Sequence, residues 1–146
     1  MIHARIEIHA PPDAVFRALT DPRELAAWWG SADTYQTSDW RVDLRPGGRW
    51  SAAARRRNEE RLTTVRGEYR VVDPPRVLEY TWEPSWEDFQ QTLVRIELEA
   101  TGAGTRMTVT HSGFGARAEG CRMHGEGWKL VLEWLAGHVS VAEAAS

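Results

Sequence analysis

The sequence carries two kinds of hydrophobic pattern, one with the period of a helix and one with the period of a strand. The longest helical pattern runs from Gly125 to Val141 and makes one wide apolar face, formed by Trp128, Leu130, Val131, Leu132, Trp134, Leu135 and Val139. At ~1.5 Å per residue it forms a rod of roughly 25 Å, which needs a broad apolar surface to pack against. We therefore predict a long C-terminal helix that lies on a sheet.

Patterns with a period of two fill most of the remaining chain. The first runs from Ile2 to Ile8, and six more follow between residues 35 and 112. In each, aliphatic and aromatic residues alternate with Arg, Glu or Thr, so one face of the sheet is apolar and the other is wet. Because the last six follow one another with turns between them, we predict an antiparallel meander. We expect the long helix to cover its apolar face above Gly67.

Two short helical patterns separate the first strand from the others. Pro and Asp at positions 11–13 open the first helix. The second begins with Asp21 as its N-cap and stops at Gly30. The adjacent Trp28 and Trp29 near its end cannot point the same way, so we predict that one fills the core while the other reaches a cavity or the surface.

This order of elements predicts an α+β fold in a single domain over residues 1–146. We expect a curved antiparallel sheet of about seven strands that grips the C-terminal helix, with the two short helices after the first strand. A chain of 146 residues is long enough for a full core.

Composition narrows the classes of function. The net charge of −3 gives no electrostatic basis for nucleic-acid binding. The helical patterns are too short and too charged to span a bilayer. Cys121 is the one cysteine, which fits a reducing compartment, and no signal peptide is recognised, so we expect a cytoplasmic protein that is a monomer or a homodimer. Eight Trp residues suit either a core or a ligand pocket.

Several local motifs, in order along nearly the whole chain, resemble the helix-grip (START-like, SRPBCC) superfamily, and most closely its branch named after the activator of Hsp90 ATPase. The matching segments are residues 10–16 and 18–22, Leu25 with Trp28-Trp29, residues 43–48 with Trp50, Gly67 with Tyr69, residues 73–76, residues 105–111, and His124 with Gly127-Trp128. The resemblance implies a helix-grip fold. The superfamily includes lipid carriers, hormone receptors, polyketide aromatase/cyclases and antibiotic self-resistance proteins.

In this superfamily a ligand cavity lies between the concave face of the sheet and the long helix. The resemblance and our assignment of faces together predict a lining of Trp29, Trp40, Trp50, Tyr69, Tyr80, Trp82, Met107, His111, Trp128 and Leu132, with Phe114, Met123 and His124 guarding the mouth from the loop before the helix. Such a lining, apolar with a few polar groups, is typical of a small-molecule site. The alternative is that these side chains simply fill a core.

Three residues are candidates for catalysis: His111 and His124 as a proton-handling pair, and Tyr80. The alternative for the histidines is a structural hydrogen bond at the rim of the cavity. Every Glu of the strand patterns falls on the wet face, so the sheet offers no inward carboxylate. There is no Cys/His cluster of zinc spacing and no glycine-rich phosphate loop, and we expect neither a metal nor another cofactor.

The leading hypothesis is therefore a protein that holds a hydrophobic or aromatic ligand, such as a lipid or a polyketide-like natural product. Without an inward carboxylate the site should favour neutral or phenolic ligands over cations. Two alternatives stay open. One is an enzyme of the cyclase, dehydratase or hydrolase kind that uses His or Tyr in the cavity. The other is an interaction module for an Hsp90-type chaperone.

Overall fold

The computed structural model describes residues 1–145, with side chains up to residue 140. Its seven strands form one antiparallel sheet in the order β1-β7-β6-β5-β4-β3-β2. The strands are β1 (Ile2–Ile8), β2 (Tyr35–Val42), β3 (Arg49–Arg56), β4 (Thr63–Asp73), β5 (Val77–Pro84), β6 (Thr92–Thr101) and β7 (Gly104–Ser112). The helices are α1 (Pro12–Thr20), α2 (Pro22–Trp28), the short 3-10 turn η1 (Ser85–Glu87) and α3 (Ala118–Ala145).

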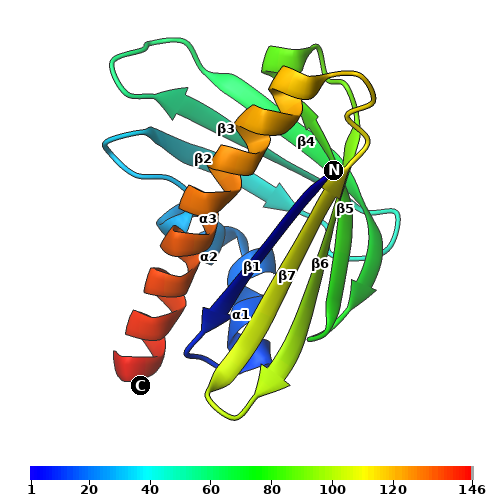
Figure 1. Ribbon diagram of the computed structural model, residues 1–146. Coiled ribbons are helices and arrows are strands. Elements are labelled where there is room, and N and C mark those ends of the chain that lie inside the picture. Colours follow the sequence, from blue (N-terminus) through cyan, green and yellow to red (C-terminus); the bar gives the residue numbers. More distant parts are fainter. Residues whose placement is uncertain (146) are drawn as a thin grey trace.

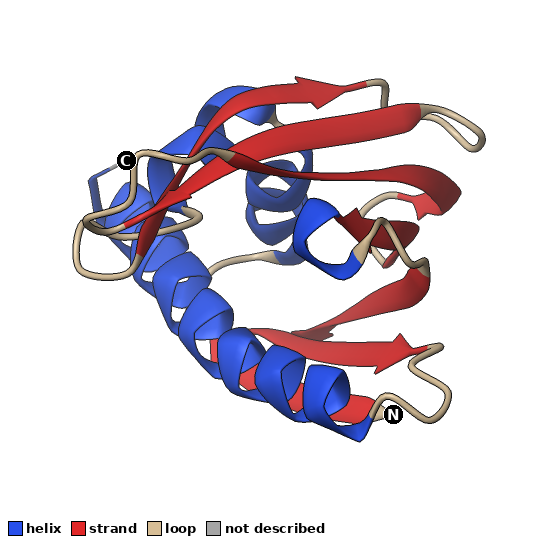
Figure 2. Ribbon diagram, turned by 90° about the horizontal axis from the view of Figure 1, so that it is seen from above, coloured by secondary structure: helices blue, strands red, loops and turns tan. Residues whose placement is uncertain are grey.

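The predicted meander is confirmed, since β2 to β7 pair in succession. β1 pairs with β7 and forms the edge of the sheet opposite β2. The sheet curls strongly, and its concave side holds the helices (Figures 1 and 2). The apolar positions of the strands face inward, as in β6, where Thr92, Val94, Ile96 and Leu98 are all buried. The α+β helix-grip architecture expected from the pattern is therefore the fold of this chain.

The two short helices lie against the concave side at one end of the sheet (Figure 1). Each has Pro in its first turn, where a missing backbone N–H costs nothing. The carboxylate of Asp21 accepts a 2.8 Å hydrogen bond from the backbone N–H of Arg23, which caps the start of α2. Their buried residues face the sheet and the long helix, so this end of the concave side is closed.

The long helix begins at Ala118, about two turns before the predicted start at Gly125. The prediction was wrong here because the first two turns are polar and contain glycine, so they lack the apolar period that marks the rest. Contacts with other elements hold these turns instead, including an ion pair between Arg117 and Glu87 of η1. Further along, α3 packs beside β1 across the open side of the sheet (Figure 1). Within residues 1–145, no helix combines the length and apolarity needed to cross a bilayer.

Gly67 is buried on β4, and the atoms nearest to a side chain built there belong to the neighbouring strands, where the long helix was expected. A Cβ atom at this position would collide with the backbone carbonyl of Thr81 on β5 and with the indole nitrogen of Trp50 on β3. The glycine therefore makes room for its neighbours in the sheet. Leu44 continues the alternation of Trp40 and Val42 in the sequence, but β2 ends at Val42 and Leu44 is exposed.

Candidate functional site

The junction of α2 with the loop that follows it places two adjacent indoles in different surroundings. Trp28 is buried and donates a 2.9 Å hydrogen bond from its indole nitrogen to the carbonyl of Ala18, which ties α2 to α1. Trp29 donates a 3.1 Å bond to the hydroxyl of Tyr35 and turns toward the sheet. One indole thus fills the core and the other reaches a cavity, as the sequence predicts.

Trp29 is the centre of a tryptophan cluster, which we define as Trp28, Trp29, Trp40, Trp50, Trp82 and Trp128. The ring centroid of Trp29 lies 5.6 Å from that of Trp40, 6.0 Å from that of Trp82 and 6.2 Å from that of Trp128. Aromatic rings at 4.5–7 Å attract one another in stacked or tilted arrangements. The cluster connects β2, β3, β5, α2 and α3 through the middle of the concave side.

A cavity of about 20 Å³ remains beside the cluster, with room for about one water molecule. Its lining comprises Leu19, Leu25, Trp29, Trp40, Trp50, Tyr69 and Tyr80. Five of these residues are in the predicted lining, and the two leucines are not. Leu19 belongs to α1 and Leu25 to α2, so the cavity lies toward the short helices and away from the long one.

The cavity is neutral, because its seven lining residues include no ionisable group other than two phenols. Burial raises the pKa of Tyr69 above its ordinary value. Burial also raises the pKa of Tyr80, and the neighbouring Tyr69 adds to the effect. Both phenols therefore stay protonated at neutral pH, which makes Tyr80 a hydrogen-bond donor but unsuited to act as a base.

Trp50 carries a buried polar atom that has no hydrogen-bond partner among the described residues, its indole nitrogen. This atom lies where the side chain of residue 67 would be, against the bare Cα of Gly67. A buried N–H without a partner costs free energy, and native proteins have few of them. The unpaired N–H lies between β3 and β4, at the wall of the cavity.

His111 lies at the centre of a buried chain of hydrogen bonds. Its Nδ1 accepts a 3.0 Å bond from the indole nitrogen of Trp128, and its Nε2 lies 2.7 Å from the hydroxyl of Thr92. Because an indole can only donate, Nδ1 carries the lone pair and Nε2 carries the proton. Burial, followed by the positive groups of His124, the N-terminus and Arg117, lowers the pKa of His111 to about 3. The ring is therefore neutral at physiological pH.

His124 is bound in a similar way. Its Nε2 accepts a 3.1 Å hydrogen bond from the indole nitrogen of Trp82, and its Nδ1 donates a 2.8 Å bond to the carbonyl of Gly120. The two imidazole rings are 5.3 Å apart, so the structure does bring the predicted pair together. Each ring, however, already uses its lone pair to accept a bond from an indole.

The remaining predicted residues fall into two groups. Met107, Trp128 and Leu132 are buried in the core, and Phe114 is buried against His111 at a centroid distance of 4.7 Å. Met123 lies on α3, not in a loop, and about half of it is exposed. His124 also belongs to α3. The expected loop that guards a cavity mouth is therefore replaced at these two positions by helix.

Two charged residues that the sequence analysis did not single out lie beside His124. A carboxylate oxygen of Glu87 is 3.8 Å from Nδ1 of His124, and its other oxygen accepts a 3.3 Å bond from Arg117. They are separated from the histidine by 37 and 7 residues, and neither stands in a recognisable motif. Only the packing of η1 against the start of α3 brings the three together.

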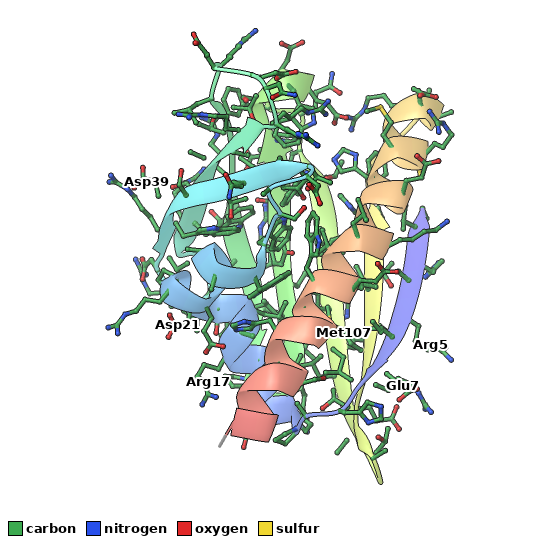
Figure 3. The ribbon with its side chains drawn as sticks, turned by 90° about the vertical axis from the view of Figure 1, so that its left-hand side faces the viewer. Arg5, Glu7, Arg17, Asp21, Asp39 and Met107 are labelled. Atoms are coloured by element: carbon green, nitrogen blue, oxygen red, sulfur yellow. The ribbon has the colours of Figure 1, made fainter. Side chains whose placement is uncertain are left out.

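The charged side chains on the outer face of the sheet pair with one another and do not reach the buried side. Glu79 pairs with Arg95 across neighbouring strands at 2.9 Å, and Glu7 pairs with Arg106 at 2.8 Å. Arg5 and Glu7 project outward from β1 in Figure 3. The described residues contain no group of three or more His, Cys, Asp or Glu side chains that could hold a metal ion.

The comparisons with known proteins agree with this architecture. The model of the family "Activator of Hsp90 ATPase homolog 1-like protein" matches residues 9–140. No curated protein matches the sequence. A crystal structure of a protein from Nitrosomonas europaea is 28% identical with a TM-score of 0.82, over 98% of this chain and 96% of that one.

Two further crystal structures are similar at lower identity. A protein from Chromobacterium violaceum is 24% identical with a TM-score of 0.81, over 94% of this chain and 96% of that one. The AHSA1 protein from Silicibacter pomeroyi is 24% identical with a TM-score of 0.80, over 97% and 98% of the two chains. At this identity the likeness concerns the fold alone. Since the family model covers nearly the whole sequence, the chain belongs to the Activator of Hsp90 ATPase homolog 1-like family.

Proposed function

We propose that this protein binds a small, neutral ligand of hydrophobic or aromatic character at the cavity beside the tryptophan cluster. The observation that carries the proposal is the chemistry of the lining, which consists of three indoles, two neutral phenols and two leucines. Flat apolar walls with a few hydrogen-bonding groups are typical of small-molecule sites. The resemblance to ligand-carrying members of the helix-grip superfamily points the same way.

Because the cavity is small, its lining side chains must move before a ligand can bind. A space of about 20 Å³ holds about one water molecule, so any larger ligand must displace a side chain. Trp40 is the least buried residue of the lining and lies on the edge strand β2, where its indole nitrogen donates a 3.0 Å hydrogen bond to Thr37. It directly follows Asp39, a residue with positive φ, at an irregularity in the pairing of β2 with β3. Displacement of Trp40 would open the cavity without disturbing the centre of the sheet.

An enzyme that uses the histidines receives less support. A general base needs a free lone pair within reach of its substrate. The lone pair of His111 accepts from Trp128, and that of His124 accepts from Trp82. Neither histidine lines the cavity. The groups around the cavity favour binding over proton transfer.

Calorimetric titration with two ligands of similar shape tests the proposal. We expect 2-naphthol to bind, and its quaternary ammonium analogue, 2-naphthyltrimethylammonium, to bind at least about tenfold more weakly, because a buried cation would lack a counter-ion. Tyr80→Phe removes one hydroxyl from the lining and should weaken the binding of 2-naphthol by roughly fivefold to tenfold, the value of about one hydrogen bond.

Tyr35→Phe is the matched control, since the Tyr35 hydroxyl contacts Trp29 from outside the lining. It should leave the affinity for 2-naphthol nearly unchanged. Failure of both compounds to bind, or equal binding of the cation, would contradict the proposal.

A second candidate function comes from the name of the family. Interaction with an Hsp90-type chaperone would appear as stimulation of the chaperone's ATPase by the purified protein. Absence of stimulation at saturating protein would remove this candidate and leave the binding proposal intact.

A further inference from the structure

The hydrogen bond between Trp82 and His124 joins the tryptophan cluster to the start of α3. The Trp82 ring stacks on Trp29 at 6.0 Å and tilts against Trp50 at 5.7 Å, and both of these residues line the cavity. On its other side, its indole nitrogen donates to Nε2 of His124 at 3.1 Å. Trp82 therefore stands between the cavity and His124, and it is only partly buried.

This bond exists only while His124 is neutral. Nδ1 of His124 donates to the carbonyl of Gly120, so a second proton has to be added at Nε2. Nε2 would then present a hydrogen to the N–H of Trp82, and two donors repel each other. The indole has no acceptor atom, so the hydrogen bond breaks and the Trp82 ring must move away from His124.

A carboxylate next to His124 can stabilise its protonated form. The Glu87 carboxylate on η1 lies 3.8 Å from Nδ1, close enough to stabilise an imidazolium. Arg117, in the loop before α3, pairs with the same carboxylate and weakens this attraction. His111 on β7 is 5.3 Å away, and the Met1 ammonium lies near Cys121 on α3. The charged groups around His124 are therefore one carboxylate, that of Glu87, and two positive groups, Arg117 and the N-terminus.

We propose that Trp82 is a proton-controlled gate, which His124 holds closed when neutral and releases when protonated, as the imidazolium moves its interaction to Glu87. The release would separate Trp82 from Trp29 and Trp50 and open a path from the small cavity toward His124 on α3. The gate itself does not depend on a ligand. Its consequence, easier ligand entry at acidic pH, rests on the proposed binding function.

Nuclear magnetic resonance of the full chain, without ligand, tests the gate. The indole N–H signal of Trp82, assigned as the one missing from Trp82→Phe, should shift or broaden with the same midpoint as the His124 ring signals. His124→Gln should abolish this pH dependence. Glu87→Gln should move the midpoint to lower pH. His138→Gln, on the same helix but 14 residues beyond His124, where the histidine contacts Glu24 of α2, should leave the Trp82 transition in place.

Quenching of tryptophan fluorescence by acrylamide, a neutral molecule, measures opening in the same samples. Quenching in the wild type should increase as His124 is protonated, and His124→Gln should remove the increase. A Trp82 signal that stays constant while the His124 ring titrates would overturn the proposal. So would a Trp82 transition that persists in His124→Gln. Failure of 2-naphthol to bind would leave these results unaffected.

Discussion

The indole nitrogen of Trp128 donates a 3.0 Å hydrogen bond to Nδ1 of His111 in the buried centre of the molecule. The bond ties α3 to β7, and a further bond from His111 to Thr92 continues it to β6. It fixes the tautomer of His111 and explains why a histidine can be fully buried on the inward face of a sheet. It also turns a candidate base into a structural acceptor.

Trp128→Phe should test the contribution of this bond to stability. The variant keeps an aromatic ring but removes the donor, which leaves the buried Nδ1 of His111 without a partner. We expect the free energy of unfolding to fall by about 1–3 kcal/mol, measured by chemical denaturation. Trp134→Phe is the control, because Trp134 is half-buried and contacts Tyr35 through its ring. Equal losses in the two variants would show that ring volume, not the hydrogen bond, accounts for the effect.

The lowered pKa of His111 predicts a pH dependence of stability. The native state binds the proton only near pH 3, whereas the unfolded chain binds it near the ordinary value of 6.5. Above pH 6.5 both states are neutral and the stabilising contribution is complete. As the pH falls from 6.5 toward 3, the unfolded state takes up the proton first, so stability is lost by about 1.4 kcal/mol per pH unit.

His111→Gln removes this titration. The variant should be less stable than the wild type at pH 7, but the difference should shrink as the pH falls through that window. Denaturation curves recorded from pH 7 to pH 4 measure it. Parallel stability profiles of the two proteins would mean that His111 takes up its proton in the native state as readily as in the unfolded one.

Gly67 and Gly127 offer a matched pair of substitutions. At Gly67 a methyl group would collide with the Thr81 carbonyl and the Trp50 indole, so Gly67→Ala should destabilise by about 1–3 kcal/mol. At Gly127 nothing lies within 4 Å of a built Cβ, and the residue is in a helix. Gly127→Ala should therefore stabilise by about 0.5–1 kcal/mol. Thermal unfolding should show a lower melting temperature for Gly67→Ala and a higher one for Gly127→Ala. An unchanged melting temperature for Gly67→Ala would show that β3 and β5 can separate to make room.

Trp29→Ala should create a cavity that a free aromatic molecule can fill. Because Trp29 is buried among other indoles, its truncation should cost about 3–5 kcal/mol. Indole added to the variant should restore part of this loss as a rise in melting temperature, and this rise should exceed any rise that indole causes in the wild type. Trp86→Ala, at an exposed indole on η1, is the control and should show neither the loss nor the rescue. A destabilised variant that indole leaves unchanged would indicate that the cluster collapses into the space.

The sequence alone determined the architecture. The period-two alternation from Tyr35 onward and the helical period after Trp128 are signals between near neighbours, so they predicted the meander, the buried face and the long helix. The early start of α3 was missed because contacts with Glu87 and Trp82, and not an apolar stripe, hold its first turns. Likewise, the role of Gly67 depends on Thr81 and Trp50, which lie on neighbouring strands.

The tertiary structure decided what the inward residues do. The face assignment and the family resemblance placed His111, His124 and several tryptophans around one region, but they could not tell whether these side chains surround a space or fill it. That depends on the distances between rings from β2, β5, α2 and α3, which leave only about 20 Å³ beside Trp29. The partners of the histidines are also distant in sequence, with Trp82 42 residues from His124. Local periodicity decides which face is buried, whereas only the packing of distant elements decides where the protons and the remaining space lie.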